Sequence, residues 1–418
     1  MQSCKYGLDE LMELVDLFNV STKNQAKIRA LLAEEETQPD AGVFFRYYNP
    51  RSKTVEFERA FAARMGCRHA LAVNSGTSAL IASLVAAGIG PGDEVIVPAY
   101  TFFASVSAVV VSKAVPVIVD INDSLAISPE AIEKAITPKT KAIIVVHMLG
   151  LNCDMERIME IARRHHLIVV EDTAQACGGQ FHGKSLGTWG DFGCISLDAY
   201  KVIGTGEGGM ILANDDFMFM RAQSYHDTAA CWRPDRFGKE RVEGELFCGE
   251  NYRMCELEAA IGLAQLRKLD WIISTCRHYC DIFRNTVKLP EGVHWTKLND
   301  ADGICGYALP LSFDDQEFSL RAQKAKIVGG NALNTTRGAR DWHMAWNWEH
   351  ITELKTATSE GCPFKCPMVQ DLKRYNKDSW PVTKDIIIRT GIVSISQFET
   401  ETAILERAKA LSEGLANC

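Results

Sequence analysis

The sequence predicts an α/β fold, a mostly parallel mixed β-sheet sandwiched by helices and followed by a smaller α+β C-terminal domain. Between about residues 55 and 215, amphipathic helical stretches alternate with short apolar runs rich in Val and Ile. This pattern is typical of a parallel sheet covered on both faces. The chain has 418 residues, of which 47% are hydrophobic. A chain of that size can bury one large core and a smaller second one, which favours two coupled domains.

The individual elements can be read in chain order. Helix starts carry capping residues: Ser128 precedes Pro129 and Glu130 at one start, and Asp154 precedes another helix. Helical stretches separate the first five predicted strands. The apolar runs expected to form strands are residues 69–73, 94–98, 115–121, 142–148, 167–172, 194–197 and 209–213.

The domain organisation follows from changes in this pattern. Residues 1–45 are expected to form an N-terminal helical segment that packs on the body or on a partner subunit, and residues 46–265 a large domain. After Asn251 the apolar spacing lengthens into a long helical region, whole or broken once. Residues 266–418 are therefore expected to form a linking helix and a small C-terminal domain.

Composition and charge argue against several classes of function. The formal charge of -8, without long runs of either sign, disfavours nucleic-acid binding, which basic surfaces drive. No stretch approaches the roughly 20 apolar residues that cross a bilayer, and the acidic opening does not resemble a signal peptide. We therefore expect a cytoplasmic protein without a membrane partner. The 14 cysteines are scattered, which favours reduced thiols, and Cys362 and Cys366 lack zinc-site spacing, so no metal is expected.

The first candidate functional element is the stretch NSGTSAL, residues 74–80, which follows a predicted strand and opens a helix. There the amides of Gly76 and Thr77 and the Thr77 hydroxyl can face an anion such as a phosphate. The alternative is that Ser75 or Thr77 only caps the helix. Taken alone, the motif is compatible with both interpretations.

The second element is Asp172, at the carboxyl end of a predicted strand, where open α/β sheets place their ligands. Its carboxylate could pair with a protonated pyridine nitrogen, which must stay charged to accept electrons from a neighbouring carbanion. The alternative is a structural carboxylate, and the adjacent Glu171 shows that an acid at this strand end need not be catalytic. Gln175 could contact the same ligand or fix the loop.

The third element is Lys201, which stands alone among apolar and glycine neighbours. A lysine amine is a useful nucleophile where its ammonium form is disfavoured, although a surface lysine is the alternative. Gly204, Gly206 and Gly209 match the letters of a dinucleotide-binding motif. The residues after them, MILA, are expected to form a strand and not the helix which that motif requires, so a dinucleotide site is rejected.

The fourth element is the polar turn GENYRM, residues 249–254, in which Asn251 could be no more than a turn residue. Together the four elements supply what a phosphorylated pyridine aldehyde needs. In this order they resemble the DegT/DnrJ/StrS family of sugar aminotransferases, which have the aspartate-aminotransferase-like fold type I of pyridoxal-phosphate enzymes. The likeness runs from about residue 45 to the C-terminus and includes GIGPGDEVIVPAYTF and AITPKTKAIIVVHMLG.

The resemblance implies a role for each matching residue. Lys201 would carry pyridoxal 5'-phosphate as a Schiff base, and Asp172 would hold the ring nitrogen. Gln175 would lie near the ring oxygen, and Phe102 would stack on the ring. The residues expected at the phosphate are Gly76, Thr77 and Ser196 of the same subunit and Asn251 from the partner subunit, which implies a homodimer with composite active sites.

The same resemblance bears on the reaction and the substrate. Relatives that remove hydroxyl groups carry a histidine in place of Lys201, so transamination is favoured. The residues HMAWNWEHI, with HMLG and YHDTA earlier in the chain, are more similar to a subgroup that aminates a 3,8-dideoxy-octulosonate sugar acid. The longer stretch NTTRGARDWHMAWNWEH departs from the His-Tyr-x-Pro-Leu-His pattern of many relatives. Arg337 and Arg340 there could bind a carboxylate or phosphate, and its tryptophans could line the pocket. Solvated arginines and core tryptophans are the alternatives.

The sequence therefore predicts a ping-pong reaction between small molecules. Glutamate is the expected amino donor, and a keto sugar, keto cyclitol or octulosonate-type acid the expected carbonyl acceptor, with Lys201 moving the proton. An enzyme of the same fold that catalyses elimination or carbon–carbon chemistry is the main alternative. A catalytically silent binding protein is a further one.

Overall fold

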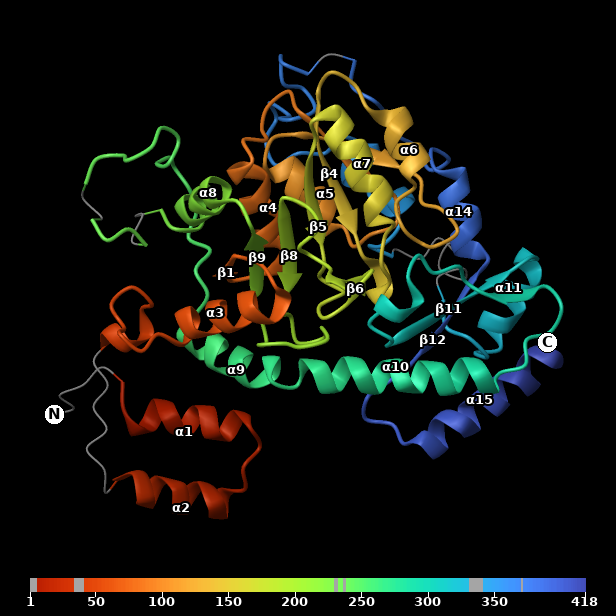
Figure 1. The fold of residues 1–418 in the computed structure, drawn as a ribbon, viewed down its shortest axis with the longest axis horizontal. Helices are drawn as coiled ribbons and strands as arrows, with labels where there is room; N and C mark the ends of the chain where they lie inside the picture. Colours follow the sequence, from red (N-terminus) through yellow and green to blue (C-terminus); the bar gives the residue numbers. More distant parts are fainter. Residues whose placement is uncertain (1–5, 34–40, 229–231, 236–237, 331–340, 370) are drawn as a thin grey trace.

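The computed structural model describes residues 6–33, 41–228, 232–235, 238–330, 341–369 and 371–418. Its centre is a seven-stranded sheet in the order β1-β9-β8-β5-β4-β2-β3 (Figure 1). The five strands from β8 to β3 are parallel to one another, and β9 runs antiparallel to both β8 and β1. The strands are β1 (His69–Val73), β2 (Glu94–Pro98), β3 (Val115–Val119), β4 (Thr140–Val146), β5 (Ile168–Asp172), β8 (Phe192–Ser196) and β9 (Gly209–Ala213).

Helices cover both faces of this sheet, and a separate hydrophobic cluster fills each side. One face packs against α4 (Gly76–Ala86) and α5 (Ala104–Val111). The opposite face packs against a second set of helices. These are α3 (Lys53–Met65), α6 (Pro129–Ala135), α7 (Met155–His165), α9 (Glu256–Leu266) and the start of α10 (Leu269–Thr286). The predicted α/β sandwich is therefore confirmed.

The strand predictions differ from the structure by no more than a few residues at the ends. All seven predicted strands form, and β1, β2 and β9 have the predicted bounds. Strand β3 stops at Val119, short of the predicted residue 121, because Asp120 and Ile121 bond to Thr383 of α14 (Pro381–Ile388) instead of extending the sheet. The remaining short elements at this sheet are α8 (Asp216–His226), β6 (Gln180–Phe181), β7 (Lys184–Ser185) and the 3-10 turn η2 (Met148–Gly150).

A second, three-stranded antiparallel sheet lies at the other end of α10. Its strands are β10 (Val293–Trp295), β11 (Ala308–Phe313) and β12 (Thr390–Ser394). Together with the end of α10 and with α15 (Glu401–Ala416), they enclose a cluster centred on Phe283 and Phe313. Helix α11 (Gln316–Lys324) and the turn η3 (Ala301–Gly303) complete this region. The α9–α10 boundary is the single break that the long helical region was expected to allow.

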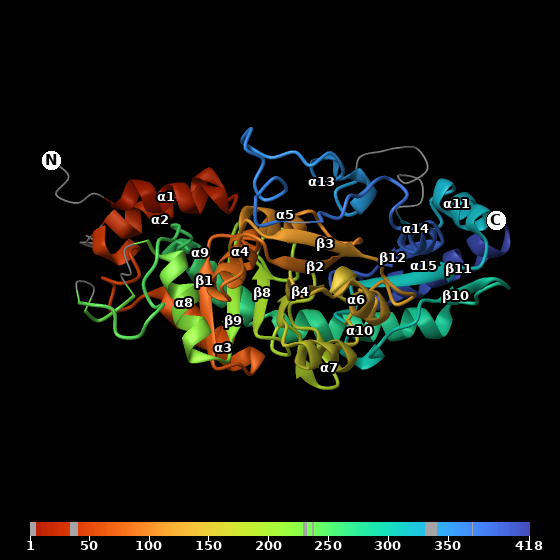
Figure 2. The ribbon, with the colours of Figure 1, turned by 90° about the horizontal axis from the view of Figure 1, so that it is seen from above.

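The stretch from residue 341 to α14 returns to the large sheet although it comes late in the chain. It contains the turn η4 (Ala345–Asn347) and the short helix α13 (Glu349–Thr352). Figure 2 shows α13 above α5. Trp346, Trp348 and Trp380 are buried in the same cluster as α4 and α5.

The N-terminal residues form the hairpin of α1 (Leu8–Leu17) and α2 (Thr22–Ala33), which Figure 1 shows beside the body of the molecule. The turn η1 (Ala41–Phe44) leads from it into the large sheet region. There the buried Arg46 guanidinium forms a two-point ion pair with Glu58 of α3. The domain boundaries at residues 45 and 265 remain predictions. None of the helices in the described residues combines the length and apolar character needed to span a membrane.

Candidate active site

A cavity of about 350 Å³ lies where β5 and β8 end and α4 begins. The structure brings seven of the predicted cofactor residues to its walls: Gly76, Thr77, Phe102, Asp172, Gln175, Ser196 and Lys201. They come from separate turns after different strands, so the folded sheet edge is what assembles them. Arg337 and Arg340, the predicted substrate residues, lie outside the described residues.

The start of α4 forms one wall of the cavity. Ser75 is the N-cap of the helix, and its hydroxyl accepts a hydrogen bond from Ser78 N at 3.0 Å. The amides of Gly76 and Thr77 precede the first intrahelical bond, which runs from Ala79 N to Ser75 O. Amides at this position lack intrahelical acceptors and attract anions. Helix capping and anion binding were alternative interpretations of this motif in the sequence. In the structure Ser75 caps the helix while the amides of Gly76 and Thr77 stay available, so one turn can serve both.

Gly76 also has a steric reason to be glycine. A Cβ at this position would lie 2.8 Å from Ser196 Cβ, across the cavity wall. Ser196 is the last residue of β8, so the absence of a side chain at Gly76 lets the helix start approach the strand end closely. The two residues expected to share the phosphate are thus held side by side.

Asp172 places a carboxylate at the cavity, whereas the start of α4 offers amides that attract anions. It is 6% exposed and borders the cavity. Its carboxylate accepts hydrogen bonds from the Ser105 hydroxyl at 2.7 Å and from Ala174 N at 3.1 Å. Burial raises the pKa of the Asp172 carboxyl, whereas these two hydrogen bonds and the charge of Lys201 act in the other direction. A buried anion with only neutral donors is suited to a cationic ligand group.

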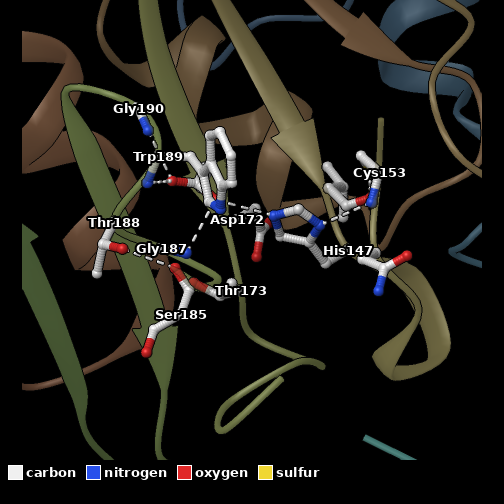
Figure 3. A network of polar contacts seen from close by, with 12 residues as sticks. His147, Cys153, Asp172, Thr173, Ser185, Gly187, Thr188, Trp189 and Gly190 are labelled. Carbon is white, nitrogen blue, oxygen red and sulfur yellow. Dashed lines mark hydrogen bonds and ion pairs between the residues drawn. The ribbon is translucent and has the colours of Figure 1, made fainter. Parts of the chain in front are cut away.

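The neighbouring Glu171 has a structural task that the sequence left open. Its buried carboxylate accepts hydrogen bonds from the backbone amides of Gly187, Trp189 and Gly190 at 2.7–2.8 Å. It also contacts His147 Nε2 at 3.1 Å. Figure 3 shows the amides on one side of this network and His147 on the other, with Asp172 beside it. Glu171 therefore ties the loop before β8 to β5.

His147 completes this network from the end of β4. Its Nδ1 accepts a hydrogen bond from Cys153 N at 3.2 Å, so Nε2, which faces Glu171, carries a proton. Its backbone N donates to Asp172 O at 3.1 Å. The imidazole is fully buried. Glu171 and His147 thus fix the backbone on both sides of Asp172. No sequence pattern indicated this pair.

Gln175 is held by backbone contacts of its own. Its Oε1 accepts a hydrogen bond from Leu149 N at 2.9 Å, and its carbonyl accepts one from the Tyr307 hydroxyl at 2.7 Å. The side chain nevertheless lines the cavity, so its amide nitrogen is the group left to meet a ligand. Gln175 can therefore both fix the loop and contact a ligand.

Lys201 lies on the connection between β8 and β9. Backbone hydrogen bonds close this connection, from Leu197 N to Gly208 O at 2.9 Å and from Thr205 N to Leu197 O at 2.8 Å. Gly206 and Gly208 have φ angles of +96° and +143°, which favour glycine. Strand β9 follows, as predicted, so these glycines shape a turn for Lys201 and not a dinucleotide site.

The Lys201 side chain is accessible from two sides. It borders the 350 Å³ cavity and a second cavity of about 430 Å³ that reaches α10 and Tyr307. Within the described part of the chain, no carboxylate forms an ion pair with its amine. The amine therefore shares a cavity with the buried Asp172 carboxylate but forms no ion pair with it.

The aromatic residues divide into ligand-facing and core groups. Phe102 is 50% exposed and lines the cavity. Trp346 and Trp348, considered as pocket walls from the sequence, instead pack in the core of the large sheet. Trp342 lies against Phe103, with ring centroids 5.7 Å apart, and does not line the cavity either. The residue of this stretch that does line it is His343, which the sequence interpretation missed.

Asn251 is not part of this cavity. It is exposed, and it pairs in an isolated β-bridge with Asp227, which is buried. Its side chain accepts a weak hydrogen bond from Arg253 N at 3.4 Å. The described residues contain no cluster of three or more His, Cys, Asp or Glu side chains arranged to hold a metal ion.

Comparison with known proteins identifies relatives of this chain. GDP-perosamine synthase from Caulobacter vibrioides is 47% identical over 223 residues, which cover 52% of this chain and 57% of that protein. L-glutamine:2-deoxy-scyllo-inosose aminotransferase from Streptomyces kanamyceticus is 39% identical over 240 residues, which cover 56% of this chain and 56% of that protein. The chain thus spans little more than half the length of these two curated relatives.

Solved structures and a family model extend the comparison. The crystal structure of 3-amino-5-hydroxybenzoic acid synthase superimposes with a TM-score of 0.70 and 26% identity, covering 90% of this chain and 94% of that one. This agreement confirms the predicted fold type I. The model of the DegT/DnrJ/EryC1/StrS aminotransferase family matches residues 46–327. By this match over most of its length, the chain belongs to the DegT/DnrJ/EryC1/StrS aminotransferase family.

Proposed function

We propose that this protein is a pyridoxal-phosphate aminotransferase that moves an amino group from glutamate to the carbonyl of a keto sugar or keto cyclitol by a ping-pong mechanism. One observation carries the proposal: the amine of Lys201 and the buried carboxylate of Asp172 border the same cavity. Membership of an aminotransferase family and the activities named for its relatives support it. We further propose that it works in the cytoplasm as a homodimer.

The residues present fit pyridoxal phosphate. The cavity volume is within the range of small-molecule sites, with free helix amides at one end and a buried carboxylate at the other. Gly76 and Ser196 would hold the phosphate, and Asp172 would hold the ring nitrogen. When bound, the cofactor supplies an aldehyde that joins covalently to amines and a cationic ring that withdraws electrons from the adjoining carbon.

The chain's own groups would carry out the remaining work. Asp172 would keep the ring nitrogen protonated, because its carboxylate is buried and accepts only from the neutral Ser105 hydroxyl and Ala174 amide among the described residues. Phe102 would cover one face of the ring. Lys201 Nζ would take the proton from the amino-bearing carbon of the donor and deliver it at the cofactor's former aldehyde carbon. Gln175 would place its amide at the ring oxygen.

We infer the class of carbonyl acceptor from the activities named for the relatives. One relative is named for a nucleotide-linked amino sugar and the other for a keto cyclitol, so we place the acceptor among polyhydroxylated carbonyl compounds. The octulosonate-type sugar acid, suggested by the wording of residues 343–351, stays a prediction within this class. Elimination or carbon–carbon chemistry on the same cofactor is the competing reaction.

The test follows each half-reaction separately. Purified protein loaded with pyridoxal phosphate is mixed with L-glutamate while the cofactor absorbance is recorded. We expect conversion to the pyridoxamine form with release of 2-oxoglutarate, and restoration by 2-deoxy-scyllo-inosose or a keto sugar nucleotide. Consumption of amino acids without pyridoxamine formation would instead indicate the competing reaction.

A variant pair assigns the reacting amine. Lys201→Ala should abolish the half-reaction and the mass increase that borohydride reduction produces on the wild-type chain. Lys297→Ala, which removes an exposed lysine far along the chain, should retain both. A borohydride adduct that persists in Lys201→Ala would contradict the assignment.

A further inference from the structure

Among the described residues that line the cavity, His343 is the one that comes from beyond the region matched by the family model, which ends at residue 327. It borders the same space as Lys201, and its ring lies against Phe102 with centroids 5.4 Å apart at an angle of 53°. A residue in this position is within reach of a ligand that occupies the cavity. It is not needed for any cofactor contact proposed above.

The backbone around His343 is fixed to the sheet. Thr101 N donates to His343 O at 3.1 Å, and Ala345 N donates to Ala99 O at 3.0 Å. Between these bonds, Met344 forms a β-bridge with Tyr100. Because residues 99–101 follow β2 directly, the segment is attached to the same sheet edge that assembles the cavity. The position of His343 is therefore set by the fold.

Aromatic packing holds the outer side of this segment. Phe103 contacts the rings of Trp348 and His350 at 5.6 and 4.6 Å between centroids. Trp348 Nε1 donates to Trp342 O at 3.0 Å. These contacts leave the segment little freedom to move away from the cavity. The wall it forms is therefore preorganised for binding.

The imidazole itself is oriented by Asp341. One carboxylate oxygen of Asp341 accepts from His343 N and lies against His343 Nδ1, both at 2.9 Å. An ionised carboxylate only accepts hydrogen bonds, so Nδ1 carries the proton and the neutral ring presents the lone pair of Nε2. Nε2 has no hydrogen-bond partner among the residues that the structure describes. The atom of this cavity-lining ring that remains available for a ligand is thus a hydrogen-bond acceptor.

We propose that His343, oriented by Asp341, binds a hydroxyl group of the carbonyl acceptor. A hydroxyl donates a hydrogen bond to an imidazole lone pair, which a ketone oxygen cannot do. The pair therefore selects acceptors that carry hydroxyl groups near the carbonyl over unsubstituted ketones. The inference rests on the proposed aminotransferase function and deepens it, because it assigns a specificity residue to the second half-reaction.

The test compares the two half-reactions in three variants. His343→Phe keeps the aromatic contact with Phe102 but removes the acceptor, His343→Gln retains a polar group, and Asp341→Asn lets an amide donate to Nδ1 and so reverses the ring's polarity. The control is His350→Phe, in the same segment but away from the cavity. Rates are measured with L-glutamate, with 2-deoxy-scyllo-inosose and with cyclohexanone.

For His343→Phe we expect kcat/KM for 2-deoxy-scyllo-inosose to fall roughly tenfold, as for one lost hydrogen bond. The glutamate half-reaction and the slow reaction with cyclohexanone should change less than threefold. His343→Gln should recover part of the loss, Asp341→Asn should resemble His343→Phe, and His350→Phe should match the wild type.

Other outcomes would overturn the inference in distinguishable ways. Equal losses with glutamate and the cyclitol would show that His343 supports the fold or cofactor, and equal losses with the cyclitol and cyclohexanone would show that no hydroxyl is recognised. No loss in any variant would also refute it. A wild-type protein that reacts with glutamate but with neither the cyclitol nor a keto sugar nucleotide would remove the proposed acceptor class. A protein inert to glutamate would refute the proposed function itself.

Discussion

Asp172 shows how one buried carboxylate can serve binding at the expense of stability. Burial raises its pKa, so the folded chain without cofactor holds this proton more tightly than the unfolded chain does. A carboxyl with a raised pKa favours the fold at low pH, and that contribution is lost as the pH rises through the folded pKa. Near neutral pH, the charge therefore opposes folding until a cation such as a protonated ring nitrogen offsets it.

We predict that Asp172→Asn raises the melting temperature of the cofactor-free protein at neutral pH but lowers its affinity for pyridoxal phosphate about ten- to hundredfold. The affinity loss corresponds to one charge-assisted hydrogen bond, and the stability gain should shrink as the pH is lowered. Differential scanning calorimetry and fluorescence titration measure the two effects. Asp191→Asn is the matched control: burial also raises the pKa of Asp191, yet this residue does not line the cavity. A control that loses cofactor equally would contradict the role of Asp172.

Residue type and position made Lys201 and Asp172 candidates, and the resemblance to the DegT/DnrJ/StrS family gave each a role. Position alone left a surface lysine and a structural carboxylate open as alternatives. His343 could not be found in this way, because its partners are Asp341 two residues away and the backbone after β2, far along the chain. In the stretch around His343 the tryptophans were the predicted pocket residues, whereas Trp346 and Trp348 pack in the core.

Among the elements, β5 depends on Glu171 for its attachment to the following loop. Three backbone amides and one imidazole donate to this single carboxylate. We predict that Glu171→Gln destabilises the protein by about 1–3 kcal/mol, because the amide cannot accept all four hydrogen bonds and leaves a buried donor unsatisfied. A lowered urea midpoint in fluorescence-monitored unfolding would report it. Glu160→Gln on the exposed side of α7 should leave the midpoint unchanged.

Helix α4 depends in turn on the close approach at Gly76. We predict that Gly76→Ala lowers cofactor affinity at least tenfold and stability by about 1–3 kcal/mol, because the new methyl group overlaps Ser196 and must displace it. Equilibrium dialysis with pyridoxal phosphate measures the first effect. Gly90→Ala is the control, since a Cβ there meets nothing within 4 Å, and it should bind normally. Wild-type affinity in Gly76→Ala would exclude this wall as the phosphate site.

Strand and helix positions were predictable because each predicted strand has a continuous apolar run that the sheet buries on both faces. The end of β3 was not, since Thr383 bonds to Asp120 and Ile121 from far along the chain, a contact that no local pattern records. The antiparallel direction of β9 also could not be predicted from its sequence. An antiparallel strand with both faces buried has the same composition as a parallel one.

At the scale of the whole molecule, Asn251 lies outside the cavity of its own chain. We predict that a second subunit brings it to the phosphate site, so cofactor affinity should fall as the protein is diluted below the dimer dissociation constant. Asn251→Ala should weaken cofactor binding about tenfold at high concentration, and Glu250→Gln should not. Sedimentation velocity with cofactor absorbance measures assembly and occupancy together. Monomers that retain cofactor at full affinity would contradict a composite site.

The late return of residues 341–388 to the large sheet has a consequence for how the chain is made. On the ribosome, β1 to β9 emerge and can pair while the segment containing Trp346, Trp348 and Trp380 is still being synthesised. Until that segment arrives, α4, α5 and the end of β2 expose the apolar surface that it finally covers. Nascent chains should therefore pass through a stage that holds Lys201 in place yet is prone to self-association and dependent on chaperones.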